Sequence, residues 1–153
     1  MLTVDQQGRL APGLAESWSQ PDDKTFVLKL RQGVKFHDGT PFNAEAVKIN
    51  IERIRDPKLG SIRGGEIRTL DSIEVVDAHT VKLNLKHAFS AFLFPFADVT
   101  GCIASPTAMQ KWGDDYAFHP VGAGPFKFVS YQKDTQTVLE RNGDYWDKGK
   151  PYI

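Results

Sequence analysis

The sequence predicts an α+β fold in which short strands and helices are mixed along the chain. Three observations carry this prediction. Apolar and polar residues alternate in residues 26–31 and again in residues 81–86, which is the period of a half-buried strand. Apolar residues also recur at helical spacing from Ala44 to Ile54. Clusters rich in Gly, Pro, Asp and Asn separate these segments, as turns do.

The first elements are strands and turns followed by one helix. Residues 15–19 are a candidate strand, and a turn at residues 21–23 leads into the strand at 26–31. Asn43 is suited to cap the helix that follows. This helix should end near Arg55, because the residue before a proline is pushed away from helical geometry.

The middle of the chain is predicted to hold a loop, a hairpin and a buried helix. Residues 58–68 contain three glycines and no clear period, which indicates a loop. Residues 73–75 and 81–86 form the hairpin. Residues 88–97 are dense in Phe and Leu, which favours a buried helix bent or ended near Pro95.

The last third is predicted to contain a short strand, a helix, a crossover and a second hairpin. The strand is expected at residues 102–104, and Ser105-Pro106 has the cap-then-proline order that opens a helix running to about Trp112. Residues 113–125 are rich in Gly, Pro and Asp and indicate a crossover or domain boundary. Strands at 126–131 and 135–140 follow.

Composition limits the possible functions. Lys plus Arg and Asp plus Glu number 19 each, so there is no basic field to hold nucleic acid. One cysteine, Cys102, excludes an internal disulfide and a cysteine-rich zinc site, and we expect its thiol to be buried and inert. Residues 1–10 lack the features of a signal peptide, so any export signal is expected outside this sequence.

Catalytic and metal-binding patterns do not emerge from the sequence. The four histidines are scattered, and those at 37 and 79 lie in predicted turns, where we expect them to be solvated. Ser, His and Asp occur without a Gly-x-Ser-x-Gly elbow. In residues 122–125 a Pro follows the second Gly and no Lys-Ser/Thr comes next, which rejects a phosphate loop. We therefore expect a protein that is not an enzyme and needs no metal or cofactor.

Four segments together resemble the bacterial extracellular solute-binding proteins of family 5, which serve ABC importers of oligopeptides, dipeptides, nickel chelates and glutathione. The segments are Leu10–Trp18, Leu28–Val47 with its core VKFHDGTPFNAEAV, Pro120–Lys127, and Leu139–Asn142 followed by Tyr145-Trp146. The family usually has Thr where this chain has Ala123. Turn and cap chemistry explains the second segment as a structural signature rather than as a ligand site.

The resemblance implies a fragment of a two-lobed fold like that of periplasmic binding proteins. Residues 1–112 would be a small extra domain, and residues 113–153 a crossover and hairpin returning to the first ligand-binding lobe. The missing C-terminal lobe of the same protein and the permease subunits in the membrane are then its partners. The resemblance also implies a periplasmic location, or an extracellular, membrane-anchored one in Gram-positive bacteria.

The function implied is non-catalytic binding of a solute, such as a small peptide, followed by lobe closure and delivery to the permease. By the same resemblance, Asp98, Val99 and Thr100 are the first candidates for the ligand site, and Arg63 is a further candidate. Gly122 and Gly124 would lie near the lobe junction, where small residues let the backbone approach a ligand or hinge. The alternative is a free-standing α+β module for protein contact that binds no solute.

Overall fold

The computed structural model describes residues 1–152 and divides the chain into two compact units. The first comprises Met1–Gln32 and Asn43–Ile103, and the second Gly33–Phe42 and Ala104–Ile153. The boundary expected after Trp112 therefore differs from this division. The assignment of the two parts to domains of a larger two-lobed protein stays a prediction.

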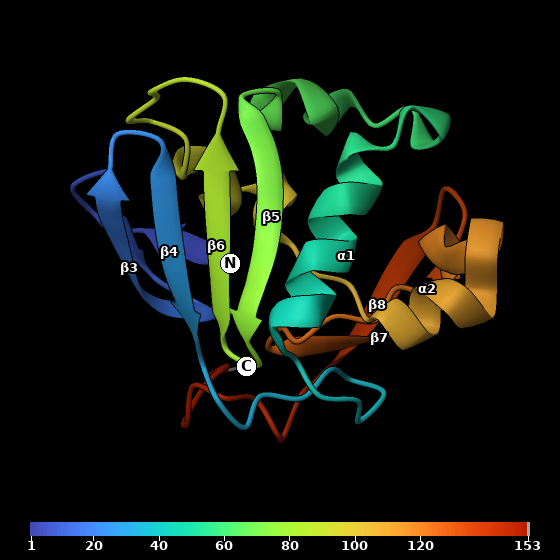
Figure 1. The fold of residues 1–153 in the computed structure, drawn as a ribbon. Coiled ribbons are helices and arrows are strands. Elements are labelled where there is room, and N and C mark those ends of the chain that lie inside the picture. Colours follow the sequence, from blue (N-terminus) through green and yellow to red (C-terminus); the bar gives the residue numbers. More distant parts are fainter. Residues whose placement is uncertain (153) are drawn as a thin grey trace. The chain divides into compact units, whose positions relative to one another are not determined.

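The first unit is built on a four-stranded antiparallel sheet with the order β3-β4-β6-β5 (Figure 1). Its strands are β3 (Ala15–Asp22), β4 (Thr25–Leu30), β5 (Leu70–Asp77) and β6 (Thr80–Leu85). Leu28 pairs with Val81 and Phe26 with Leu83, and all four side chains are buried. The alternation in the sequence thus predicted both central strands and the face that they bury.

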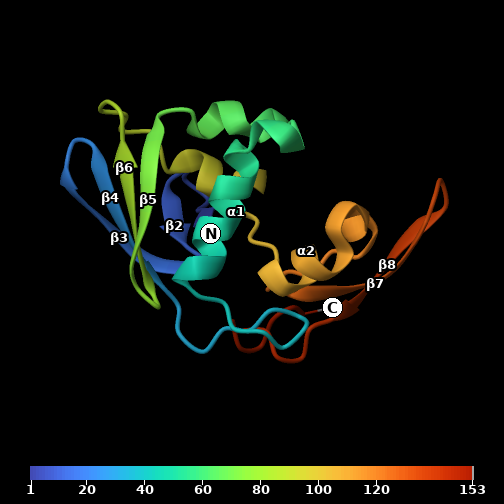
Figure 2. The ribbon, with the colours of Figure 1, turned by 45° about the vertical axis from the view of Figure 1, so that its right-hand side comes forward.

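Helix α1 (Ala44–Arg55) covers one face of this sheet (Figure 2). The Asn43 side chain accepts a hydrogen bond from the Ala46 amide at 2.9 Å, which caps the helix as predicted. Val47 and Ile51 are fully buried on the apolar stripe. The helix ends at Arg55, just before Pro57, for the steric reason given above.

The segment before β5 is more ordered than the predicted loop. It holds two 3₁₀ helices, η1 (Pro57–Leu59) and η2 (Ile62–Ile67), each capped by a side chain. Asp56 accepts from the Lys58 amide and Ser61 from the Arg63 amide. A period of three over so few residues is too short to be recognised in the sequence. A strand pair β1 (Leu2–Val4) and β2 (Leu10–Pro12) at the start of the chain was not predicted as such.

The prediction of a buried helix at residues 88–97 is wrong. The segment forms turns followed by 3₁₀ helices η3 (Phe94–Ala97) and η4 (Val99–Gly101). Its burial was predicted correctly in part: Phe92 and Phe96 are fully buried and pack on each other with ring centroids 5.6 Å apart. Phe94 is half exposed. Pro95 lacks an N–H and blocks a continuous α-helix at this point.

The second unit contains helix α2 (Pro106–Trp112), the 3₁₀ helix η5 (Gly113–Phe118) and a hairpin of β7 (Phe126–Gln132) and β8 (Gln136–Arg141). Ser105 caps α2 through a hydrogen bond from the Ala108 amide at 3.2 Å, as the sequence predicted. The strand expected at residues 102–104 does not form, and Cys102 is exposed rather than buried. Both of these predictions are wrong.

The β7–β8 hairpin has one apolar face. Phe128 pairs with Leu139, and a bulge at Val129 then shifts the register so that Tyr131 pairs with Thr137. Residues 137 and 139 share a face of β8, so the bulge brings Tyr131 to the same side as Phe128. Leu139 is 53% exposed on this face.

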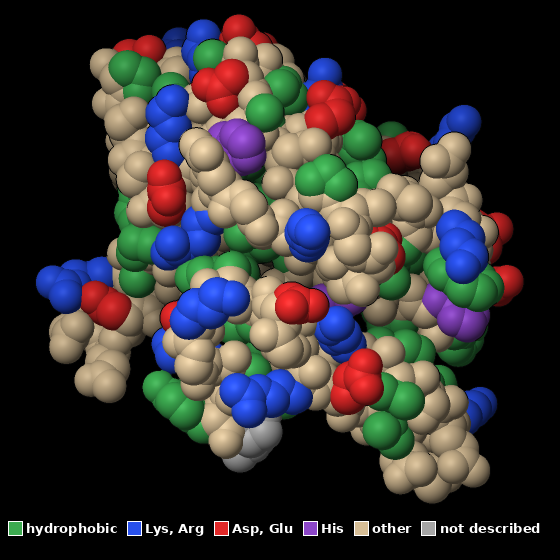
Figure 3. Space-filling view, turned by 90° about the horizontal axis from the view of Figure 1, so that it is seen from below, with side chains coloured by type: hydrophobic (Ala, Val, Ile, Leu, Met, Phe, Trp, Pro, Cys, Tyr) green, Lys and Arg blue, Asp and Glu red, His purple; other side chains and the backbone are tan. Residues whose placement is uncertain are grey.

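The space-filling view shows Lys and Arg side chains interspersed with Asp and Glu on the face that it presents (Figure 3). This mixture agrees with the zero net charge of the chain. Within residues 1–152, no helix combines the length and the apolarity needed to cross a membrane.

Candidate functional site

Four polar side chains from two separate stretches of the first unit meet in a cluster, which we call the Arg63 cluster. Arg63 Nη1 donates to Glu66 Oε1 at 2.6 Å and lies 3.6 Å from Asp98 Oδ2. Thr100 donates its hydroxyl proton to the other carboxylate oxygen of Glu66. The structure therefore brings together three predicted site residues, Arg63, Asp98 and Thr100, and adds Glu66.

Local backbone geometry fixes both stretches. Arg63 and Glu66 are three residues apart on η2, the spacing that places side chains next to each other in a 3₁₀ helix. The Gly101 amide donates to the Asp98 carbonyl at 2.8 Å and closes the turn that holds Asp98 and Thr100. A Cβ atom at residue 101 would lie 1.8 Å from the carbonyl oxygen of Phe96, so only glycine fits there.

The electrostatics of the cluster are dominated by hydrogen bonds to Glu66. The hydrogen bond from Thr100, and then that from Arg63, lower the pKa of the Glu66 carboxyl. The hydrogen bond and the charge of Glu66 raise the pKa of Arg63. Both shifts stabilise the ionised forms of Glu66 and Arg63, and the cluster contains one basic and two acidic side chains.

Apolar side chains border the cluster at the surface. Ile62, beside Arg63 in the chain, is 90% exposed, and Val99, beside Asp98, is 51% exposed. Single exposed apolar side chains are common on protein surfaces, so the geometry of the cluster and not this exposure makes it the candidate. Val99 was a predicted site residue, and its exposure is compatible with contact to a ligand.

Gly122 and Gly124 lie in the second unit, where their backbone groups hold His37. The His37 amide donates to the Gly122 carbonyl at 2.8 Å, and the Gly122 amide donates to His37 Nδ1 at 3.4 Å. His37 Nε2 then carries the proton and donates to the Gly124 carbonyl at 3.0 Å. The expectation that His37 is solvated is wrong, because it is half-buried with both ring nitrogens bonded. A ligand role for the two glycines stays a prediction.

Asp38 makes a second connection in the same unit. Its carboxylate accepts from the Ser105 hydroxyl at 2.5 Å and from the Thr40 amide at 3.0 Å. Partial burial raises the pKa of Asp38, but the hydrogen bonds from Ser105 and Thr40 outweigh it and leave the pKa below its ordinary value. These contacts hold the turn at residues 37–41 to the start of α2, which supports the structural explanation of the signature.

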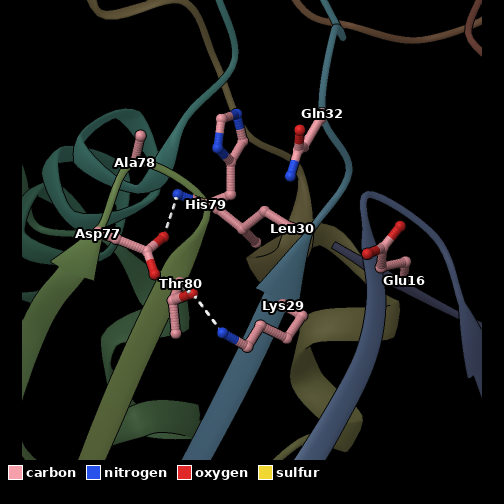
Figure 4. A pocket seen from close by; sticks show the side chains of 8 residues that line it. All are labelled: Glu16, Lys29, Leu30, Gln32, Asp77, Ala78, His79 and Thr80. Atoms are coloured by element: carbon pink, nitrogen blue, oxygen red, sulfur yellow. Dashed lines mark hydrogen bonds between the residues drawn. The ribbon is translucent and has the colours of Figure 1, made fainter.

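A shallow hollow of about 390 Å³ lies at one end of the four-stranded sheet (Figure 4). Its lining residues are Glu16, Lys29, Leu30, Gln32, Asp77, Ala78, His79 and Thr80. Lys29 Nζ donates to Thr80 Oγ1 at 2.8 Å, and Thr80 donates to Asp77 at 2.8 Å. Asp77 also accepts from the His79 amide, so these groups close the β5–β6 turn. This mutual bonding gives the polar groups that line the hollow a structural task in the turn.

Among residues 1–152, no three His, Cys, Asp or Glu side chains are grouped so that they could hold a metal ion. Sequence reasoning missed Glu66. Its one signal is its place three residues after Arg63, and that spacing carries meaning only once the segment is known to be helical.

Comparison with known proteins defines the class. The family model described as "Bacterial extracellular solute-binding proteins, family 5 Middle" matches residues 9–153. Solved periplasmic binding proteins share the fold: MppA, a periplasmic murein tripeptide binding protein, superposes with a TM-score of 0.87 over 95% of this chain at 21% identity. The chain belongs to the family 5 extracellular solute-binding proteins.

Relatives with higher identity bind different solutes. The glutathione-binding protein GsiB of Shigella flexneri is 39% identical over 154 residues, which is 100% of this chain and 30% of the relative. AgaA of A. tumefacien R10, solved with agropinic acid, is 37% identical with a TM-score of 0.92 over 99% of this chain and 31% of its own. NikZ of Campylobacter jejuni, solved with Ni(L-His), is 28% identical with a TM-score of 0.85 over 95% of this chain and 30% of its own. The chain thus spans about 30% of the length of these relatives.

Proposed function

We propose that the chain is part of the solute-binding component of an ABC-type importer, working outside the cytoplasmic membrane without making or breaking bonds. The observation that carries this proposal is the family match over residues 9–153. The protein would be periplasmic, or membrane-anchored and extracellular in a Gram-positive bacterium. Its partners would be permease subunits and, within the same protein, the C-terminal lobe.

The proposed solute is a small peptide or a similar amino-acid-derived molecule. The GsiB relatives, named for glutathione, support a peptide-like solute at 39% identity, and AgaA supports an amino-acid derivative at 37%. In a two-lobed protein the solute is enclosed when the lobes close, and each lobe supplies part of the contacts. The Arg63 cluster, which includes Asp98 and Thr100, and the neighbouring Val99 would supply the solute contacts of this part of the chain.

Isothermal titration tests the proposal. The full-length product of the gene should bind glutathione or one of a set of di- to pentapeptides. The 153-residue chain alone should bind the same solute weakly or not at all, because half of the enclosure is missing. Absence of binding by the full-length protein across the whole set would refute the proposed function. Micromolar binding by the 153-residue chain would refute the role given to the missing lobe.

The exposed apolar face of the β7–β8 hairpin favours a second candidate, a protein-interaction module. Tyr131 and Leu139 are each about half exposed there, and the Phe118 ring lies 6.3 Å from that of Tyr131. Size-exclusion chromatography of the 153-residue chain separates the candidates. A dimer that Leu139→Ser dissociates would support the module, whereas a monomer at high concentration would count against it.

A further inference from the structure

The partners of Arg63 hold it unequally. Glu66 bonds its Nη1 at 2.6 Å, and Glu66 is itself anchored by the fully buried Thr100. Asp98 is 3.6 Å away, and its side chain is 66% exposed. An exposed ion pair of this length contributes little to stability, so Asp98 can exchange Arg63 for another cation at low cost. Glu66 therefore positions the guanidinium, while Asp98 is accessible to a ligand.

The guanidinium of Arg63 has N–H donors that make no contact within residues 1–152. It carries five N–H groups, and its contacts within residues 1–152 use only Nη1. The Nε and Nη2 donors form one edge of the planar group. That edge matches the two oxygens of a carboxylate in a bidentate arrangement.

The charge balance of the Arg63 cluster selects what can bind there. Two carboxylates and one guanidinium leave one net negative charge, which favours an ammonium group and disfavours a carboxylate offered alone. A group that carries an ammonium and a carboxylate on the same carbon atom can bind Asp98 and the Nε–Nη2 edge of Arg63 at the same time. The exposed side chains of Ile62 and Val99 would then contact the carbon atoms of the same solute.

We propose that Arg63 and Asp98 bind the α-amino-acid head group of the solute, with its ammonium on Asp98 and its carboxylate on the Nε–Nη2 edge of Arg63. Glu66 is a positioning residue that holds Arg63 for this purpose. The inference rests on the proposed function and narrows its solute class to molecules with a free α-amino-acid group.

The probes are glutathione, whose γ-glutamyl residue carries a free α-amino-acid group, N-acetylglutathione, and peptides acetylated and amidated at their ends. Isothermal titration uses the full-length protein and its Arg63→Gln and Asp98→Asn variants. Arg68→Gln is the matched control, because Arg68 is exposed at the end of η2 and its side chain has no partner within residues 1–152. Melting temperatures check that each variant is folded.

The proposal expects glutathione to bind the unaltered protein and each of the two site variants to bind it roughly 10- to 100-fold more weakly, with Arg68→Gln unchanged. N-acetylation should weaken binding to the unaltered protein but make little further difference in Asp98→Asn. This loss of discrimination would not follow from a purely structural role of Asp98.

Three outcomes would overturn the inference, and they differ in what they leave standing. Binding of glutathione that neither site variant weakens would remove the role of Arg63 and Asp98 and leave the proposed function intact. Binding of the blocked peptides but not of glutathione would do the same. Binding of none of these probes would overturn the inference, and if the unblocked di- to pentapeptides do not bind either, the proposed function falls with it.

Discussion

The hydroxyl of Ser105 has two tasks, which makes Ser105→Ala a sharp test of how the second unit is held together. The hydroxyl accepts from the Ala108 amide at 3.2 Å, which caps α2, and donates to Asp38 at 2.5 Å. Ser105 is fully buried, so water does not replace its hydroxyl at the Ala108 amide, whereas Asp38 is exposed and can be partly solvated. The variant therefore loses a helix cap and also leaves one carboxylate oxygen of Asp38 without this donor.

The expected cost follows from the two bonds. Loss of an N-cap costs about 1 kcal/mol, and loss of a hydrogen bond to a charged group about 1.5–3 kcal/mol. The two share one hydroxyl and are not additive, so we expect about 2–4 kcal/mol in total. Such a loss raises the population of the open state of α2 roughly 30-fold or more.

Native-state hydrogen exchange, followed by mass spectrometry on peptides covering Pro106–Trp112, measures this opening directly. Ser130→Ala in β7 is the matched control, because Ser130 is exposed and its hydroxyl makes no hydrogen bond within residues 1–152. Exchange of α2 should accelerate in Ser105→Ala and stay within about threefold in the control. Equal exchange in both variants would refute the assignment of the Ser105 hydroxyl as the connection between α2 and the turn.

Three further predictions concern pH, backbone fit and the core. The stability contributed by Asp38 should be complete above the ordinary carboxyl pKa near 4 and should be lost as the pH falls through the lower pKa of the folded state. Hydrogen exchange of α2, measured as a function of pH, should show this loss. In the control variant Asp38→Asn, the stability of α2 should not change over the same pH range. Gly101→Ala should destabilise the chain by about 2 kcal/mol or more in urea unfolding, because its Cβ would meet a backbone carbonyl oxygen at 1.8 Å, whereas at Gly65 a Cβ meets nothing within 4 Å and Ala should be tolerated. Phe92→Ala should cost about 3–5 kcal/mol and Phe94→Ala less than about 1 kcal/mol, since Phe92 is fully buried and Phe94 is 49% exposed; similar melting temperatures would contradict the packing described.

Regular elements could be predicted from the sequence because their periods are local. Apolar and polar residues alternate within the six residues of β4 and of β6. The apolar stripe of α1 lies within twelve residues, next to the residue that caps the helix. The prediction of a helix at residues 88–97 failed for the opposite reason. Their burial is visible in their composition, but the choice between an α-helix and successive 3₁₀ turns depends on Pro95 and on the close approach of Gly101 to Phe96.

The candidate site could be predicted only in part. Resemblance to the family led to Arg63, Asp98 and Thr100, but their mutual contacts join residues about 35 positions apart, and no local pattern encodes such contacts. Glu66, which bonds to both Arg63 and Thr100, was missed for that reason. The position of Cys102 at the surface was equally invisible, because residue type predicts burial only on average.

The segment at residues 33–43 concentrates the family signature because its residues have structural tasks in both units. The chain leaves the first unit after Gln32 and re-enters it at Asn43, which caps α1. Between these points, the His37 backbone and ring bond to Gly122 and Gly124, and Asp38 bonds to the cap of α2. A change in this segment would therefore weaken elements that are distant in the sequence. The signature is thus a property of how the units are built, and under the proposed function the solute contacts would come from other side chains, such as those of the Arg63 cluster.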